Sequence, residues 1–192
     1  MNRTRSTRWL ICVSCVLGLA ACGGNDETSI SGNLSGLNAG ASVTLQDNGA
    51  DNLTLSANGP FQFATFVPGG SSYNVTVLTQ PAGQVCDVTS GSGTLDAAGD
   101  PVSSVVVTCV TTASVSGTVS GLASGTSVTL SNGGELLPVA VNGAFAFPGT
   151  LPVGSAYAVA VALQPVGEIC TVANGTGTVE TNVANPVSVS CS

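Results

Sequence analysis

The sequence predicts an all-β protein in which two tandem immunoglobulin-like antiparallel β-sandwich modules follow a signal peptide. Three observations predict this fold class. The chain repeats itself once after its first 28 residues, each repeat contains about seven short β-prone runs separated by turn residues, and each repeat contains two cysteines. No stretch has the periodicity of an amphipathic helix.

The first segment of the chain is typical of an export signal. All three basic residues lie within the first eight positions, and an apolar run over residues 9–19 follows them. Eleven apolar residues are too few for a transmembrane helix, which needs about 20, but they suit the core of a signal peptide. Cys12 and Cys15 lie inside this segment, so we expect them to be removed with residues 1–21.

The end of this segment, Leu19-Ala20-Ala21-Cys22, resembles the lipobox of bacterial lipoproteins. The resemblance implies that Cys22 receives a diacylglycerol, becomes the mature N-terminus and anchors residues 22–27 as an acylated tether. It also implies a lipid-anchored protein of the cell envelope, and Gly23 after the cysteine favours the outer membrane. The alternative is an ordinary secretory signal, in which Cys22 is incidental.

The mature chain is strongly acidic. The whole sequence has a net charge of −7 with three Lys and Arg residues, so removing those three basic residues leaves −10. Nucleic-acid binding is excluded, because it needs Lys and Arg to neutralise phosphates. Anionic lipid headgroups are disfavoured for the same reason, and this leaves the acyl group on Cys22 as the expected contact with the membrane.

The repeat defines two modules, which we expect at residues 28–110 and 112–192. Residues 29–37 return as residues 114–122 at an offset of 85, and the later motifs return at an offset of 84. A unit of about 80 residues is closer to a small domain than to a solenoid repeat. Residues 109–114 contain no Gly or Pro, which predicts a stiff junction between the modules.

The strands of the first module are expected where β-branched and aromatic residues alternate with polar ones. Asn58-Gly59 and Asn142-Gly143 indicate tight turns, because both residue types tolerate positive φ. The alternating Phe61 and Phe63 place two rings on one face. The expected strands are residues 29–34, 42–46, 53–57, 61–63, 73–78, 85–88 and 102–110.

The remaining four cysteines allow three pairings, and the repeat favours Cys86–Cys109 and Cys170–Cys191. If residues 85–88 and 102–109 are antiparallel neighbours, the two cysteines of the first pair lie opposite each other, within the span of a disulfide. A metal or redox role is the less favoured interpretation, because the mature chain has no His and no C-x-x-C pair.

No catalytic, metal-binding or cofactor-binding residue is predicted, and the chain has no His to act as a general base. Asp47 and Asp51, like Asp96 and Asp100, have a four-residue spacing that could collect Ca²⁺. Their counterparts in the second repeat are Asn132 or non-acidic, so solvated loop carboxylates are the favoured interpretation. Residues 80–86 and 164–170 form either a binding loop or, more simply, a turn that sets the register of the cysteine strand.

The order S-G-x-V/L-S-G-L, V-T-L, N-G-x-F-x-F, G-x-x-Y-x-V and Q-P-x-G-x-x-C resembles the repeat of uncharacterised bacterial surface lipoproteins. Its first four elements are similar to collagen-adhesin B-type, prealbumin-like modules. The isopeptide bond of those modules is impossible here, because the chain has no Lys. We therefore expect a non-catalytic envelope lipoprotein that acts as a spacer or interaction module. The alternative is a binding protein for a glycan or partner protein through exposed strands or loops.

Overall fold

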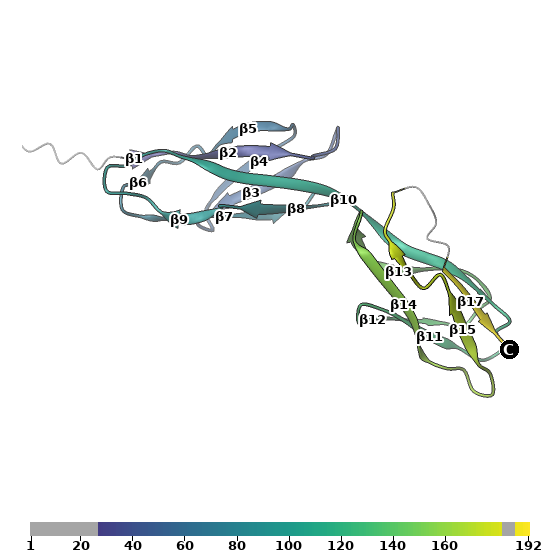
Figure 1. Ribbon diagram of the computed structural model, residues 1–192. Helices are drawn as coiled ribbons and strands as arrows, with labels where there is room; N and C mark the ends of the chain where they lie inside the picture. Colours follow the sequence, from purple (N-terminus) through teal and green to yellow (C-terminus); the bar gives the residue numbers. More distant parts are fainter. Residues whose placement is uncertain (1–26, 182–186) are drawn as a thin grey trace, which may run out of the picture.

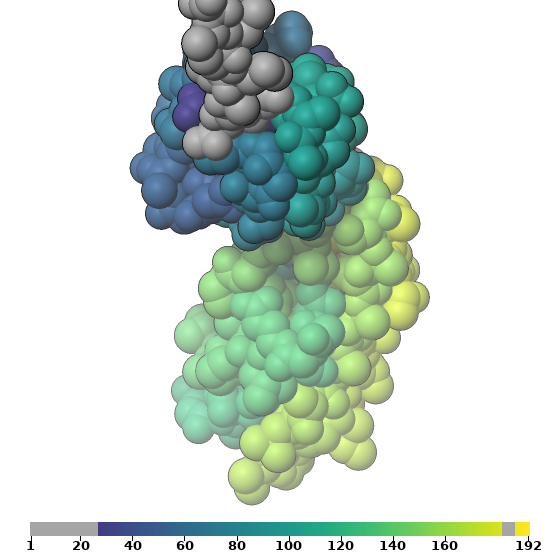
Figure 2. Space-filling view, turned by 90° about the vertical axis from the view of Figure 1, so that its left-hand side faces the viewer, coloured from purple at the N-terminus to yellow at the C-terminus, as the bar shows by residue number. Residues whose placement is uncertain are grey.

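The computed structural model describes residues 27–181 and 187–192, and it is all-β, as predicted. Figure 1 shows two β-sandwich modules that lie end to end and share one long strand, β10 (Val102–Ser120). Figure 2 shows the same two bodies in space-filling form, with module 1 above module 2. Within the described residues, no helix is long and apolar enough to cross a membrane.

Module 1 is a sandwich of two four-stranded sheets. A short extra pair, β1 (Glu27–Thr28) with β6 (Val67–Pro68), lies at the end where the module begins. Glu27, which was expected in the tether, is therefore part of a strand. The first sheet has the order β5 (Gly59–Gln62), β2 (Ile30–Ser35), β10 and β8 (Gln84–Thr89), and the second has β4 (Asp51–Leu55), β3 (Val43–Asp47), β7 (Ser72–Thr79) and β9 (Ser92–Thr94).

Module 2 repeats this arrangement. Its first sheet contains β13 (Gly143–Pro152), the second half of β10, β17 (Val187–Cys191) and β15 (Cys170–Ala173). Its second sheet contains β12 (Glu135–Val139), β11 (Val128–Asn132), β14 (Ala156–Leu163) and β16 (Thr176–Thr178). The residues equivalent to β5 and β6 of module 1 form one continuous strand, β13, in module 2.

Each module also contains one parallel pair within its otherwise antiparallel sheets. Strand β2 runs parallel to the first half of β10, and the second half of β10 runs parallel to β17. Apart from the short strand β1, these are the first and last strands of each module. They are far apart in the sequence, so no hairpin requires them to run in opposite directions.

Strand β10 serves both modules. Its first half is the last strand of module 1, where Cys109 lies opposite Cys86, and its second half is the first strand of module 2, where Thr112 lies opposite Pro152. The strand can continue for 19 residues because the segment between the modules is β-prone and lacks a residue that would end it. The stiff junction predicted from the sequence is therefore a continuous strand.

The apolar core falls into two clusters, one in each module. In each cluster two rings pack edge to face. Phe61 of β5 and Phe63, which directly follows β5, have centroids 6.1 Å apart, and Phe145 and Phe147 of β13 have the same separation. The central residues of β3 and β11, Leu45 and Leu130, are fully buried. The predicted alternation of rings and aliphatic side chains therefore builds the core.

The strands that the sequence did not predict are short and lack large side chains. Strand β9 contains Gly93, which lies opposite Tyr73 and beneath its ring, and β16 contains Gly177 beneath Tyr157. A Cβ added at Gly93 would lie 2.9 Å from a ring carbon of Tyr73. These glycines are stabilised as strand residues by the aromatic side chains that cover them, which is a tertiary effect.

Candidate functional site

The two disulfides lie at equivalent places, near the end of each module that is farther from the N-terminus. Cys86 bonds to Cys109 and Cys170 bonds to Cys191, which are the pairings that the repeat favoured. Each pair joins residues directly opposite each other on antiparallel strands. The bridges close loops with sequence separations of 23 and 21 residues, and each should stabilise its module by about 3 kcal/mol.

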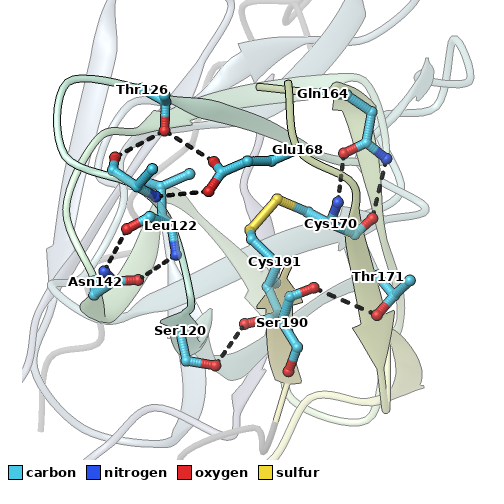
Figure 3. The surroundings of a disulfide bond; sticks show 12 residues. Ser120, Leu122, Thr126, Asn142, Gln164, Glu168, Cys170, Thr171, Ser190 and Cys191 are labelled. Carbon is cyan, nitrogen blue, oxygen red and sulfur yellow. Dashed lines mark hydrogen bonds between the residues drawn. A yellow bond between two sulfur atoms is a disulfide. The ribbon is translucent and has the colours of Figure 1, made fainter. Parts of the chain in front are cut away.

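A glutamine side chain holds the backbone of the first cysteine in each pair. The amide of Gln80 accepts a hydrogen bond from Cys86 N at 2.7 Å and donates one to Cys86 O at 2.9 Å. Gln164 makes the same two bonds with Cys170 (Figure 3). The side chain thus replaces a neighbouring strand for one residue, and this supports the interpretation of residues 80–86 and 164–170 as register-setting turns.

The prediction that Asn58-Gly59 and Asn142-Gly143 form tight turns with positive φ at both residues is wrong for the asparagines. Gly59 and Gly143 have positive φ, but neither Asn58 nor Asn142 does. The Asn58 side chain instead bonds to both Leu37 N and Leu37 O at 2.8 Å, and Asn142 makes equivalent bonds to Leu122. The asparagine therefore joins two loops rather than forming a left-handed turn, because its amide finds both a donor and an acceptor across the loop.

The glycine of each S-G-L motif, Gly36 or Gly121, packs directly on a disulfide cysteine. Gly36 and Gly121 have φ of 78° and 77°. A Cβ at Gly36 would lie 2.0 Å from Cys109 O, and one at Gly121 would lie 2.1 Å from Cys191 O. Only glycine can occupy these positions without a shift of the backbone, because both the conformation and the space exclude a side chain.

A further side chain completes this loop cluster, and here the two modules differ. Gln84 is buried, donates to Gly36 O and accepts from Asn38 N. Its counterpart, Glu168, is a carboxylate and can only accept hydrogen bonds. It accepts from Ala123 N at 2.9 Å and from the Thr126 hydroxyl at 3.1 Å (Figure 3).

The junction of the modules is held by backbone hydrogen bonds on both sides of β10. Thr112 N donates to Gly83 O in module 1 at 2.9 Å, and Val153 N of module 2 donates to Thr111 O at 2.8 Å. The turn that follows β7 therefore touches β10 at the point where module 2 begins. Module 2 therefore adjoins the end of module 1 that contains the disulfide.

A small cleft recurs at the opposite end of each module, between the β3–β4 or β11–β12 hairpin and the next connection. The clefts have volumes of about 290 Å³ in module 1 and 350 Å³ in module 2. Each contains a carboxylate that is already engaged: Asp51 accepts a hydrogen bond from Thr65 N, and Glu135 accepts one from Gly149 N. Glu135 corrects the expectation that the counterparts in the second repeat are Asn132 or non-acidic. The single-residue deletion precedes this position, so Asp51 is equivalent to an acid.

Two other candidate calcium ligands, Asp47 and Asp96, also accept hydrogen bonds from backbone amides. Asp47 is buried and accepts a hydrogen bond from Asn74 N, as Asn132 does from Ala158 N. Asp96 accepts from Asp100 N, and that bond is the main reason why the pKa of Asp96 lies below its ordinary value. Within the described residues, no group of three or more His, Cys, Asp or Glu could hold a metal ion. Cys22, the predicted lipidation site, lies outside the described residues.

Comparison with known proteins places the chain in no family. No protein-family model matches the sequence, and no curated protein matches it. A Streptococcal ancillary pilin matches with a TM-score of 0.43 and 13% identity over 87% of this chain and 63% of that chain. The Bacillus anthracis TIE protein matches with a TM-score of 0.34 and 19% identity over 75% of this chain and 29% of that chain. This chain thus spans less than two thirds of each of these proteins.

Proposed function

We propose that this chain is a non-catalytic lipoprotein of the cell envelope, anchored through an acyl group on Cys22, whose two modules act as a stiff spacer. The observation that carries the proposal is strand β10, which belongs to both modules without a break. A hinge between domains needs residues that can change φ and ψ freely. Here the junction residues are paired on both sides, to Gly83 and to Val153.

The polar side chains support a structural role for the chain. The four carboxylates Asp47, Asp51, Glu135 and Glu168 each accept hydrogen bonds from backbone amides within their own module. A general acid or nucleophile needs a carboxylate that can reach a substrate. These carboxylates instead accept hydrogen bonds that order the backbone around them, so they stabilise the fold.

The aromatic residues favour a spacer over a glycan-binding protein. Binding of sugar rings would use exposed aromatic side chains gathered on one face, whereas a spacer needs its rings in the core. Six of the seven aromatic residues after position 22 are buried, and Phe66 is the exception at 55% exposed. One exposed ring gives no face on which several sugars could stack.

Proteinase K treatment of intact cells tests the proposal. We expect the chain in the membrane fraction, labelled by palmitate, and degraded when intact cells are treated with the protease. A periplasmic marker protein should survive the same treatment. Protection that disappears after permeabilisation would place the spacer on the periplasmic side of the membrane.

Two cysteine variants test the anchor. Cys22→Ser should abolish palmitate labelling and release the protein from membranes, because the thiol is the proposed acylation site. Cys15→Ser is the matched control, because it changes a cysteine that the processing model removes, and it should leave labelling unchanged. Recovery of the wild-type protein in a soluble fraction without palmitate would contradict the proposal.

A further inference from the structure

Apart from the short strand β1, the strand that opens each module lies beside the strand that closes it, and the two run in the same direction. Residues 30–35 of β2 pair with residues 102–108 of β10 in module 1, and residues 117–120 of β10 pair with residues 187–190 of β17 in module 2. Figure 1 shows β2 and β10 side by side along module 1. The chain therefore enters each module at one end of this pair and leaves it at the other end.

This geometry decides how a pull along the chain acts on each module. Tension draws the opening strand toward the entry and the closing strand toward the exit, so the two strands are pulled past each other along their length. The hydrogen bonds of a parallel pair are evenly spaced. A pull along the strands therefore loads them together, whereas a pull that separates the strands at one end breaks them one after another.

Side-chain hydroxyls add cross-links between the same two strands. Ser31 Oγ donates to Val102 O at 2.8 Å, and Ser35 Oγ donates to a second carbonyl of β10 at 3.5 Å. In module 2 the hydroxyl of Ser120, which is equivalent to Ser35, donates to Val189 O at 3.4 Å. The opening strand cannot slide past the closing strand without breaking these bonds as well.

The two strands also approach each other closely under an aromatic ring. A Cβ added at Gly32 of β2 would lie 2.1 Å from Val105 O, and one at the equivalent Gly117 would lie 2.1 Å from Val187 O. The buried ring of Phe61 lies against Gly32, and module 2 repeats this contact. The ring keeps water from the hydrogen bonds beside it, and such bonds are stronger where the local dielectric constant is low.

The disulfide of each module lies at the exit of the closing strand. Cys109 directly follows Thr108, the last residue of β10 that pairs with β2, and Cys191 has the same place on β17. A pull on this end is therefore transmitted through a covalent bond to a second strand, β8 or β15. The residues between the cysteines, 87–108 and 171–190, cannot be drawn out while the bridge is intact.

We propose that each module is a mechanical clamp, formed by its opening and closing strands, and that this chain bears tension along its length. The parallel pair, the serine cross-link, the glycine contact and the exit disulfide all recur in module 2. Strand β10 passes tension from one clamp to the next without a linker that could extend first. A spacer that only sets a distance needs no particular direction of its terminal strands, so this role goes beyond the proposed function.

Single-molecule force spectroscopy of residues 23–192 tests how the load acts on module 1. The chain is held first by its two ends, and then by its N-terminal end and a clickable handle at Ala98, an exposed residue between β9 and β10. The second arrangement opens the β2–β10 pair from one end. We expect module 1 to unfold at least about tenfold more slowly in the end-to-end pull at equal load, because the unfolding rate governs forced unfolding.

The length gained identifies the unfolding events of the end-to-end pull. Each module should lengthen the chain by up to about 200 Å, the extended length of residues 29–86 in module 1. The residues behind each disulfide do not contribute. Two such events are expected for each chain, and the event of module 2 serves as the internal reference for variants of module 1.

A double variant tests the serine cross-links. Ser31→Ala/Ser35→Ala removes both hydroxyls between β2 and β10. Under the same end-to-end load, one of the two events should become about tenfold faster, the effect of losing two hydrogen bonds that oppose sliding. The other event should keep the wild-type rate.

The matched control is Thr44→Val/Thr76→Val, which removes two hydroxyl hydrogen bonds from the other sheet of module 1. Both events of this control should keep the wild-type rate under load. Urea unfolding of the two double variants measures ordinary destabilisation, and we expect similar midpoints. The difference between the variants should therefore be seen under load alone.

Equal unfolding rates for the two ways of holding module 1 would overturn the proposal, and this comparison keeps both serines in place. A control variant that unfolds under load as fast as the serine variant would overturn it too, as would a serine variant with wild-type rates. These outcomes are independent of the acyl group on Cys22. A wild-type protein without palmitate would contradict the proposed anchor and leave the mechanical clamp unaffected.

Discussion

At the residue scale, each module is held by a few amide side chains that bond to backbone groups elsewhere in the same module. Gln80 and Asn58 each use both ends of an amide: Gln80 bonds to Cys86 of the disulfide, and Asn58 joins its own loop to Leu37. Each neutral hydrogen bond contributes about 0.5–1.5 kcal/mol. Because module 2 repeats these contacts with Gln164 and Asn142, the Q-P and N-G motifs are explained by structure rather than by ligand binding.

Alanine at Gly121 should destabilise module 2 much more than alanine at Gly125. Both residues have positive φ, 77° and 83°, so each substitution incurs a backbone cost of about 1–2 kcal/mol. At Gly125 the new Cβ meets nothing within 4 Å, but at Gly121 it would lie 2.1 Å from Cys191 O. We expect a loss of about 1–2 kcal/mol for Gly125→Ala and at least about 3 kcal/mol for Gly121→Ala.

Urea unfolding followed by far-ultraviolet circular dichroism measures this difference, with the disulfides intact in both variants. Gly125→Ala serves as the control, because it shares the conformational cost without the close contact. Equal losses for the two variants would show that the approach of Gly121 to Cys191 is not what makes glycine necessary there.

At the element scale, β10 decides how the two modules are connected. It is the last strand of one sandwich and the first of the next, and the β-prone junction has no residue that ends a strand. The strand that opens each module pairs in parallel with the strand that closes it, β2 with β10 in module 1 and β10 with β17 in module 2. The closing strand of one module can therefore continue as the opening strand of the next. The two modules are then connected through a shared strand, and no separate linker is needed.

Proline at position 112 should loosen the junction while leaving the modules folded. Thr112 N donates to Gly83 O, and proline has no N–H with which to replace this bond. The nearest fully buried core residues, Val107 and Val115, lie on either side of this position. We therefore expect small-angle X-ray scattering to show a broader distribution of maximum dimensions for Thr112→Pro, with melting temperatures of the modules changed by only a few degrees.

The control for the junction is Thr112→Val, which keeps the N–H and the β-branched shape. Its scattering curve should match that of the wild-type chain. If Thr112→Pro also scatters like the wild type, the stiffness of the junction does not depend on the continuous pairing of β10. Collapse of both melting transitions would instead show that the modules are not separable units.

At the scale of the whole molecule, the chain has two small cores joined end to end, with acids and no bases after position 8. Cores of this size bury little apolar surface, and the disulfide and the loop contacts compensate in each module.

Trypsin should leave the mature protein intact even when it is reduced and unfolded. The three possible cleavage sites, Arg3, Arg5 and Arg8, all lie in the segment that export is expected to remove. Intact-mass spectrometry of the cell-isolated protein before and after trypsin should show no change, whereas proteinase K should degrade the same unfolded sample. A tryptic fragment that lacks the first residues of the chain would show that the signal segment had been retained.

The sequence by itself determined the fold class, the duplication, the core rings and the disulfide partners, because these follow from alternation of side chains and from internal repetition. It misassigned Asn58 as a tight-turn residue and missed Ser92–Thr94 as a strand. Both depend on a partner distant in the sequence, Leu37 in one case and the Tyr73 ring in the other.

The tertiary structure alone decided that one strand serves both modules and which loops meet at the end of each sandwich, where Asn142 bonds to Leu122 in module 2. Local periodicity records which side of a strand faces a core, but not which loops meet at the end of a sandwich. That meeting depends on the order of strands in the sheets, which only the folded chain specifies.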